Sequence, residues 1–544
     1  MDIIATALIL LLAVVLSGPI ARALPIPLPL VQVALGSALA SVGGLDVELR
    51  PGVFFLLFLP PLLFLDGWRI PKEGLMHDKI TILALAFGLV VFTVVGLGFL
   101  VNWMIPAMPL AVAFALAAIV SPTDPVAVSA IASRSPIPTR LMNILEGESL
   151  LNDASGLVCM RFAILAALTG TFSLADAFAT FLWLAIGGVA VGVAVTLGVI
   201  WAKRQVSRRY GEETGSQILI SLLIPFAAYL LAERLQCSGI LAAVAAGITM
   251  GYAERTGQAL ALTRMRRASF WDTVEFAANG VIFVLLGEQL PRIVGDAADA
   301  VHKTGHHDRV WLLVYVVGIN AALAALRFVW VWVSFHLTLR RGARHGQKVH
   351  KPTWRLIAAA SLAGVRGALT LAGVLTLPLT LADGSPFPAR DVAICLAAGT
   401  IVVSLVAASV GLPALLKGLE LPPEPSHRAE EDRARVAAAE AAIGAIRQAQ
   451  HDLSEGRKDA DIYAEAGARV MELYRQRIER GSRTGAEAEQ IRRIDHIERD
   501  LRLAGIRAER DTLYDLVRRR RLPEEAAQRL VRELDLLETR FAIA

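Results

Sequence analysis

Two carboxylates lie close together in a segment that is otherwise apolar, Gly147–Asp153 (GESLLND). They belong to Glu148 and Asp153. On a helix, Ser149, Asn152 and Asp153 share one face, because residues three and four positions apart are neighbours. An Asp at the centre of a bilayer costs about 2.5 to 3.5 kcal/mol on insertion scales, so an acid inside an apolar span indicates a functional site. The segment therefore predicts chemistry that depends on a charge or a proton.

A second acidic segment, Ser121–Pro125 (SPTDP), lies about 25 residues earlier. Pro122 and Pro125 each remove a backbone donor and clash with the preceding turn, so a helix should unwind near Thr123. Carbonyls that are freed inside a membrane must be satisfied by other groups or by a bound ion, which is why such breaks line cavities. We expect Asp124 and this break to join the GESLLND face in one ion site.

The expected ligands are hard oxygen donors of the kind that hard cations require. They are the Asp153 carboxylate, the Ser149 hydroxyl, a backbone carbonyl near Thr123, and Asp124 either directly or through water. Burial disfavours a charged carboxylate, so a proton and a cation should compete for the oxygens of Asp153. Neutral Asn152 adds no titrating charge and should orient Asp124 or the broken backbone by amide hydrogen bonds.

Other charges in apolar segments should find partners inside the protein. Arg366 lies between two glycines (GVRG) in a later apolar segment, and we expect Glu148 to neutralise it in a structural ion pair. Asp66 ends an apolar run near a membrane boundary, where it fits either an interfacial acid or a part of the ion pathway. Interhelical pairing or hydrogen bonding is expected for three more residues, Glu275, Asn279 and Arg327.

The composition indicates a membrane protein. The chain has 544 residues, of which 55% are hydrophobic, its mean hydropathy is +0.54, and its repeated apolar runs have the length of about 20 residues that crosses a bilayer. The net charge is +5, and the Lys and Arg residues lie mostly in loops and in the tail, which indicates membrane orientation rather than nucleic-acid binding. Neither a disulfide framework nor a cysteine metal site is predicted for the three separate cysteines Cys159, Cys237 and Cys395.

The apolar pattern predicts an all-α polytopic protein with about thirteen transmembrane helices. The expected spans are residues 2–21, 28–44, 52–68, 79–104, 107–133, 140–169, 175–202, 215–233, 237–253, 270–290, 310–339, 354–379 and 391–416. Basic residues gather in the loops that are cytoplasmic if the N-terminus lies outside, and the odd count then leaves the C-terminus in the cytoplasm. The fifth and twelfth spans carry the two breaks, an arrangement typical of inverted repeats in alternating-access transporters.

Residues 419–544 form a different region, which is charge-balanced, rich in helix-forming residues and predicted to be a cytoplasmic helical domain. Leu421–Pro425 is a predicted linker because of its prolines. Amphipathic helices are expected around residues 462–478, 491–504 and 524–542. The region is either a solvated extension or a regulatory module that docks on residues 1–418 or on a dimer mate.

Three segments, Thr123–Pro125, Gly147–Asp153 and Gly364–Gly367, together resemble the sodium/proton exchangers of the cation:proton antiporter-1 family in their bacterial, NhaP/NHE-like form. The resemblance covers about residues 1–418. It implies thirteen spans, a homodimer, a core domain that moves against a dimerisation domain, and exchange of one cation for one proton.

The resemblance also implies roles for single residues. Asp153 would be the acid that binds the ion and the proton, surrounded by Ser149, Thr123 and Asp124. Asn152 stands where electrogenic relatives have a second Asp, which favours electroneutral exchange. The pair Glu148 and Arg366 resembles the buried salt bridge of the family. Asp66 stands near a position where relatives can carry an acid that contacts the ion.

We therefore predict an antiporter of a bacterial inner membrane, not an enzyme, that exchanges cytoplasmic sodium for external protons without a cofactor. Potassium/proton antiport is the alternative, and the sequence leaves the choice among sodium, lithium and potassium open. A cation channel could use the same acids but would conduct passively. A proton-coupled transporter of an organic solute would need a larger recognition site. An intramembrane protease is disfavoured because neither HExxH nor GxSxG occurs in the chain.

Overall fold

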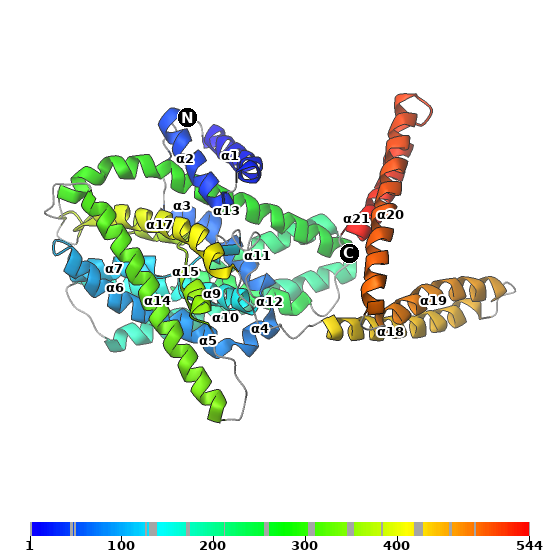
Figure 1. The fold of residues 1–544 in the computed structure, drawn as a ribbon, viewed down its shortest axis with the longest axis horizontal. Helices are drawn as coiled ribbons and strands as arrows, with labels where there is room; N and C mark the ends of the chain where they lie inside the picture. Colours follow the sequence, from blue (N-terminus) through cyan, green and yellow to red (C-terminus); the bar gives the residue numbers. More distant parts are fainter. Residues whose placement is uncertain are drawn as a thin grey trace. The chain divides into compact units, whose positions relative to one another are not determined.

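The chain folds into two compact units, Met1–Leu419 (unit 1) and Glu420–Ala544 (unit 2). The structure, a computed structural model, describes residues 3–24, 26–43, 47, 51–125, 128–129, 139–169, 174–211, 213–254, 261–302, 310–344, 353–381, 384–417, 428–455, 460–482 and 486–542. The described part is almost entirely helical (Figure 1), and its one extended pairing is a bridge between Thr380 and Pro386. The prediction of an all-α protein is confirmed.

Unit 1 contains a long series of helices that follow one another with short connections. In chain order they are α1 (Ile3–Ala23), α2 (Leu28–Gly43), α3 (Pro51–Arg69), α4 (Lys72–His77), α5 (Lys79–Leu83), the π-helix η1 (Ala84–Leu89), α6 (Val90–Met104), α7 (Leu110–Val120), α9 (Thr139–Thr169), α10 (Leu174–Tyr210), α11 (Thr214–Arg234), α12 (Gly239–Glu254), α13 (Ala261–His302), α14 (Val310–Arg344), α15 (Trp354–Leu362), α16 (Ala368–Leu375) and α17 (Arg390–Leu416).

The length and apolar composition of these helices fit a multi-pass membrane protein. Within the described residues, nine helices are long and apolar enough to cross a membrane. Three shorter apolar helices accompany them, at Leu28–Ser41, Leu110–Val120 and Gly239–Glu254. The count of thirteen spans stays a prediction, and part of the expected fifth span, 107–133, lies outside the described residues.

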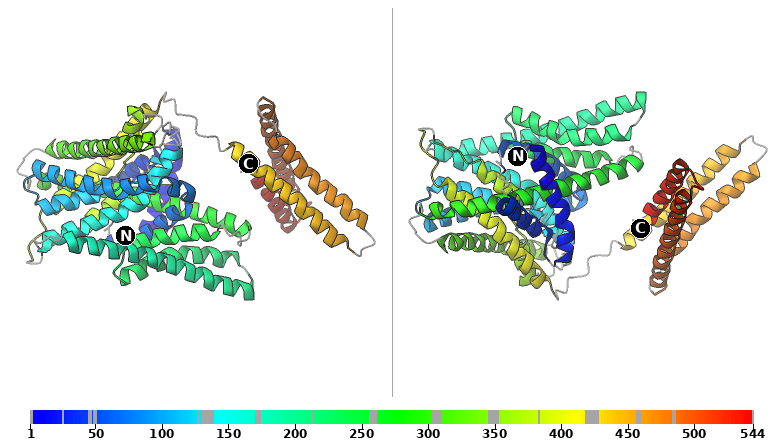
Figure 2. Two further views of the ribbon diagram at one scale, coloured as in Figure 1. Left: turned by 90° about the horizontal axis from the view of Figure 1, so that it is seen from below. Right: turned by 90° about the horizontal axis from the view of Figure 1, so that it is seen from above.

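Helix packing divides unit 1 into two groups. In the first, which we call the scaffold group, α2 packs on α13 and α3 on α12, with α1, α10 and α11 against them. In the second, the site group, α7 packs on α6 and α9, and α14 to α17 complete the cluster. The two groups meet along a seam where α9 approaches α3 and α12, and where α13 contacts α16 and α17. Figure 2 shows the closely packed helices of unit 1 from two further sides.

Both predicted helix breaks are present, and they touch. Helix α7 ends at Val120 before the first proline, and five residues separate the end of α15 at Leu362 from the start of α16 at Ala368. The backbone N–H of Asp124 donates a hydrogen bond to the carbonyl of Val365 at 2.7 Å. The two non-helical segments therefore cross inside the site group, and each satisfies some of the other's backbone hydrogen-bonding groups.

The core of the site group surrounds α7, whose residues from Val112 to Val120 are almost all buried. Its sequence is apolar on every side (LAVAFALAAIV), as expected for a helix with neighbours all round. The last turn of α7 lies against α9 at Gly156, where a Cβ would overlap the ring of Pro122. The close approach of α9 to the first break therefore depends on this glycine.

Unit 2 consists of two helical hairpins, in which α18 (Arg428–Ser454) packs on α19 (Ala460–Ser482) and α20 (Ala486–Arg518) on α21 (Glu524–Ala542). The Arg510 guanidinium joins the second hairpin by ion pairs with Asp535, at 2.8 Å, and with Glu538. The three predicted amphipathic helices correspond to α19, α20 and α21. The predicted linker Leu421–Pro425 lies outside the described residues.

Candidate functional site

Helix α9 carries four of the predicted site residues, and they differ in their exposure. Glu148 and Asn152 are each 1% exposed and Ser149 is 8% exposed, whereas Asp153 is half-buried. Ser149 precedes Asp153 by one helical turn on the same face. Of the two carboxylates in Gly147–Asp153, that of Asp153 is thus the more accessible.

Thr123, in the first break, is held between two of these side chains. The amide Nδ2 of Asn152 donates to Oγ1 of Thr123 at 2.9 Å, and the Thr123 hydroxyl donates to Oε1 of Glu148 at 3.3 Å. The Oδ1 atom of Asn152 is buried and has no hydrogen-bond partner within the described part of the chain. Asn152 therefore contacts the broken segment as expected, through a threonine hydroxyl rather than through Asp124.

Asp124 lies at the start of α16. Its carboxylate packs so closely on Gly367, the residue before α16, that a Cβ at this glycine would overlap Oδ2 of Asp124. The first amide groups of a helix have no intrahelical partner and carry partial positive charge, which favours a carboxylate at this end. The second break thus supplies an environment that stabilises the charged form of Asp124.

Arg366 takes the opposite position, at helix C-termini. It is 5% exposed, its Nε donates to the carbonyl of Val120 at 2.9 Å, and its Nη1 donates to the carbonyl of Gly364. Val120 is the last residue of α7, and Gly364 follows the end of α15. A cation at these ends compensates their partial negative charge and satisfies carbonyls that the breaks leave without an intrahelical donor.

The partner of Glu148 corrects our prediction. The carboxylate of Glu148 accepts two hydrogen bonds from the guanidinium of Arg327 in α14, at 2.5 and 2.6 Å, in a buried two-point ion pair. Arg327 also donates through Nε to the carbonyl of Ala360 at 3.0 Å. The expected direct pair between Glu148 and Arg366 was therefore wrong, because Arg366 is engaged by the carbonyls of the broken helices.

Interhelical pairing was correctly expected for Arg327 and for Glu275. The latter accepts a hydrogen bond from Arg69 at 2.6 Å. The local signal for Arg327 was an arginine inside an apolar helix, which needs an acidic partner. Sequence spacing did not show which acid that was.

Asp153 has a different electrostatic environment from Glu148. Its carboxylate makes no ion pair or hydrogen bond with another described residue, and the nearby charges that act on it are the carboxylates of Asp124 and Asp66. Asp66, an exposed residue near the end of α3, is within electrostatic range of Glu146 and Glu275 as well as of Arg69. The structure therefore brings Asp153, Asp124 and Asp66 into one acidic region, with Glu148 neutralised beside it.

A π-helical turn next to the site was not predicted. Ser155, two residues after Asp153, donates a hydrogen bond to the carbonyl of Ala86 in η1 at 2.5 Å. A π-helical turn spaces its carbonyls more widely than an α-helix, and such turns are frequent at functional sites. No sequence pattern marked this turn, since its residues (ALAFGL) are ordinary for an apolar helix.

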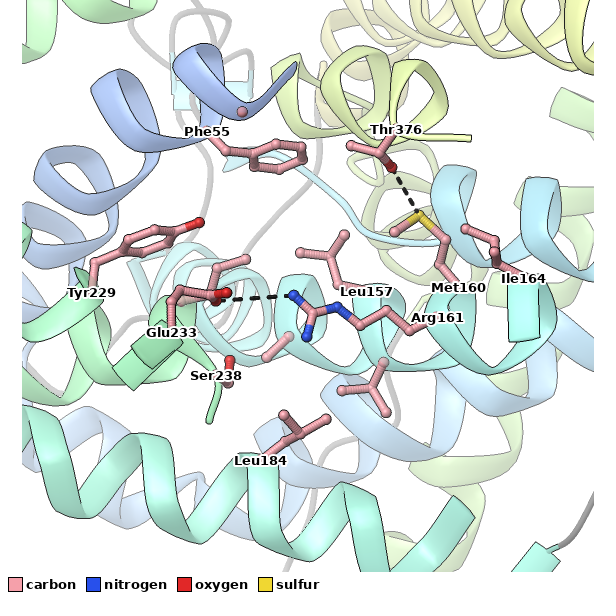
Figure 3. Close-up of a pocket in the computed structure, with 14 residues that line it drawn as sticks. Phe55, Leu157, Met160, Arg161, Ile164, Leu184, Tyr229, Glu233, Ser238 and Thr376 are labelled. Carbon is pink, nitrogen blue, oxygen red and sulfur yellow. Dashed lines mark hydrogen bonds and ion pairs between the residues drawn. The ribbon is translucent and has the colours of Figure 1, made fainter. Parts of the chain in front are cut away.

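A cavity of about 360 Å³ begins one residue after Asp153, at Ala154, and follows α9 along the seam between the two helix groups (Figure 3). The Arg161 and Glu233 side chains face each other across it. Within the described residues, no group of three or more His, Cys, Asp and Glu side chains is arranged to hold a metal ion. An alkali cation at Asp153 would therefore depend on hydroxyl and carbonyl oxygens in addition to carboxylates.

Comparison with known proteins gives consistent matches. The family model described as "Sodium/hydrogen exchanger, transmembrane" matches residues 8–418. The chain is 42% identical to an uncharacterised Na+/H+ exchanger of Escherichia coli K12, over 99% of this chain and 98% of that protein. It is 38% identical to a sodium, potassium, lithium and rubidium/H+ antiporter of Bacillus subtilis, over 100% of this chain and 78% of that protein.

A solved structure shares the fold. The sodium proton antiporter MjNhaP1 of Methanocaldococcus jannaschii aligns with a TM-score of 0.56 at 20% identity. The alignment covers 77% of this chain and 99% of that chain.

Proposed function

The chain belongs to the sodium/hydrogen exchanger family, and we propose that it exchanges sodium for protons by binding them in turn at Asp153. It is a secondary transporter of the membrane and not an enzyme. The transport family carries no cofactor, and we extend this to the present chain, whose only small partners would be the transported ions.

One observation supports this role of Asp153 above the others. Glu148 is already neutralised by two hydrogen bonds from Arg327, whereas the Asp153 carboxylate has only other carboxylates as charged neighbours. A half-buried acid in such a place needs a cation or a proton to compensate its charge. Because it can cross the membrane cheaply only when compensated, each crossing carries one of the two ions, which couples their movements.

The proposed ion ligands are the oxygens around Asp153. They are the hydroxyls of Ser149 and Thr123, a carbonyl of the first break, and the carboxylate of Asp124. Asn152 supports this set by holding Thr123 through its amide. Asp66 is the most exposed of these candidates, and we therefore assign it to the approach path rather than to the innermost ligands.

We propose a stoichiometry of one cation for one proton, which is electroneutral. The neutral Asn152 stands beside Asp153, and Glu148 is occupied by Arg327, so one of the two carboxylates of Gly147–Asp153 is left to carry ions. The charges of the buried Arg366 and of the partly buried Asp124 each lie at helix ends of opposite partial charge, and we expect both to stay in place during the transport cycle.

The setting of the protein is also part of the proposal. We place it in a bacterial inner membrane as a homodimer, with the N-terminus outside and the C-terminus in the cytoplasm, because the basic loops favour this orientation. Unit 2 would then be a cytoplasmic helical domain, and we propose that it regulates transport. Exchange would help to control the sodium concentration and the pH of the cell.

The second candidate function is the exchange of a wider range of alkali cations for protons. The relative from Bacillus subtilis is named for sodium, potassium, lithium and rubidium, and it aligns with the whole of this chain. Potassium/proton or lithium/proton exchange at the same site is therefore the alternative to a strict preference for sodium. A channel or an organic-solute transporter has no comparable support.

Exchange by the purified protein in liposomes tests these proposals. A proton gradient is imposed, a pH dye is followed, and sodium, lithium or potassium is added with the membrane potential clamped at different values. Dissipation that depends on the cation and not on the potential supports electroneutral antiport and identifies the ion. A rate that changes with the potential would contradict one-for-one exchange, and no response to any alkali cation would contradict the proposed function.

A further inference from the structure

The cavity beside Asp153 has walls from both helix groups. Ala154, Leu157 and Arg161, on one face of α9, form one side. Phe55 of α3 and Tyr229 of α11 belong to the opposite side (Figure 3). A cavity that starts next to the proposed ion-binding acid and opens along the seam has the position of an access path.

The direction of this path follows from the proposed orientation. With the N-terminus outside, α9 runs from the cytoplasm outward, so residues after Asp153 lie toward the outer surface. Arg161 follows Asp153 by eight residues, which is about 12 Å along a helix. The cavity therefore leads from the outer side toward Asp153, and Arg161 lies along this route.

Arg161 and Glu233 carry opposite charges across the cavity. Nη2 of Arg161 is 3.9 Å from Oε1 of Glu233, and their side chains are 56% and 38% exposed. This ion pair joins the site group, through α9, to the scaffold group, through α11. Glu233 is positioned by the backbone N–H of Gly239, which donates to Oε1 at 3.2 Å.

The geometry of this pair suits an electrostatic role better than a mechanical one. An exposed ion pair at the limit of contact distance contributes little to holding two helix groups together. Charges inside a cavity with apolar walls, however, act strongly on ions that pass, because the walls focus the field. The rise of about 12 Å from Asp153 to Arg161 is only slightly longer than the screening length of about 8 to 10 Å at physiological salt, so the effect should be measurable and sensitive to salt.

We propose that this cavity is the outer entrance to Asp153 and that the opposing charges of Arg161 and Glu233 set the local concentration of cations inside it. Arg161 repels an entering cation, and Glu233 balances this repulsion. The pair therefore determines the external cation concentration at which transport is half-saturated. This inference rests on the proposed antiport function and on the proposed orientation.

The test compares Arg161→Gln, Glu233→Gln and the double variant in right-side-out and everted membrane vesicles. The half-saturating sodium concentration is measured at low and high concentrations of a salt that is not transported. With sodium at the outer face, Arg161→Gln should lower this concentration and Glu233→Gln should raise it. Removing one unit charge about 12 Å from Asp153 should change the half-saturating sodium concentration about two- to ten-fold. The double variant should resemble the wild type, and high salt should reduce each change.

Two control variants separate charge from structure. Arg161→Lys keeps the charge and should keep the wild-type value. Arg234→Gln removes an exposed positive charge at the end of the same helix as Glu233, outside the cavity lining, and should have a smaller effect than Arg161→Gln.

The possible outcomes distinguish this inference from the proposed function. Shifts of the two single variants in the same direction would overturn the electrostatic role and indicate a mechanical latch. If both single variants keep the wild-type half-saturating sodium concentration while the wild type exchanges normally, the inference alone is overturned. Shifts that occur only in everted vesicles would overturn it as well. Absence of any cation-dependent exchange by the wild type would overturn the proposed function and this inference with it.

Discussion

Glu148 and Arg327 form a two-point ion pair inside unit 1, with N–O distances of 2.5 and 2.6 Å. The pair joins α9 to α14, and Arg327 reaches on to the carbonyl of Ala360 before the second break. It therefore fixes the helix that carries Asp153 relative to the broken segments. Because Glu148 is neutralised in this way, Asp153 is the carboxylate of Gly147–Asp153 that we propose exchanges its compensating ion.

The first prediction concerns this pair. Replacing Arg327 by Met should destabilise the protein by about 3 to 5 kcal/mol, because it leaves the buried carboxylate of Glu148 without a partner. The melting temperature of the detergent-solubilised protein, followed by size-exclusion chromatography after heating, measures the loss. Glu148→Gln in the same chain should recover part of it, because the charge that lacked a partner is then removed.

A double-mutant cycle identifies the partner directly. We expect a coupling energy of about 0.5 to 3 kcal/mol between Glu148 and Arg327, and a smaller coupling between Glu148 and Arg366. A larger coupling to Arg366 would contradict the pairing in the structure and restore the pair that the sequence suggested.

The second prediction concerns Asp153. Asn has nearly the same shape but neither titrates nor carries charge, so Asp153→Asn should reduce exchange to the background of empty liposomes while the protein still folds. Sodium at a free concentration of about 100 times its dissociation constant should stabilise the wild-type protein by about 2.7 kcal/mol. The variant should lose this stabilisation. Because protons compete with sodium for the same oxygens, the stabilisation of the wild type should decrease as the pH falls.

Asp461→Asn, in an exposed position of unit 2, is the matched control and should behave as the wild type. Substantial coupled exchange by Asp153→Asn would remove Asp153 from the role of ion carrier.

The two helix breaks could be predicted because their causes are local. Pro122 and Pro125 each remove a backbone donor and clash with the preceding turn, which favours a break at this closely spaced pair, and a carboxylate beside them in an apolar segment needs a polar environment. The helices of unit 2 could be predicted for the same reason, since their composition and periodicity are properties of the segment itself.

The partner of Glu148 could not be predicted, because it depends on which helix faces α9 in three dimensions. Arg366 appeared suitable by its position between glycines, but the carbonyls of Val120 and Gly364 take up its donors. The π-helical turn at Ala86 and the cavity beside Arg161 were missed for a related reason. The cavity is lined by segments far apart in the sequence, and the residues of the π-helical turn carry no pattern that distinguishes them from an ordinary apolar helix.

The third prediction concerns unit 2. A chain that ends at residue 419 should still fold and exchange ions, because unit 1 is a compact unit by itself. If unit 2 regulates transport, the pH dependence of exchange by this truncated chain should differ from that of the full chain. The measurement is sodium-dependent exchange in liposomes over a range of pH.

Point variants in unit 2 refine this comparison. Arg510→Ala removes the ion pairs to Asp535 and Glu538 between the hairpin helices and should reproduce part of the effect of truncation. Arg475→Ala, which breaks an exposed pair within α19 alone, should not. Identical pH profiles for the truncated and full chains would leave unit 2 without a regulatory role.

The last prediction concerns the contact between the two breaks. A methyl group at Gly367 would overlap the carboxylate of Asp124, so Gly367→Ala should displace that carboxylate from the start of α16. If Asp124 is a ligand of the ion, exchange should fall and the half-saturating sodium concentration should rise.

Gly198→Ala in α10 is the control, because a Cβ there meets open space. The control should retain exchange and gain up to about 1 kcal/mol of stability from its better helix propensity. Wild-type affinity for sodium in Gly367→Ala, with the same stability, would show that the position of Asp124 against α16 does not matter for binding.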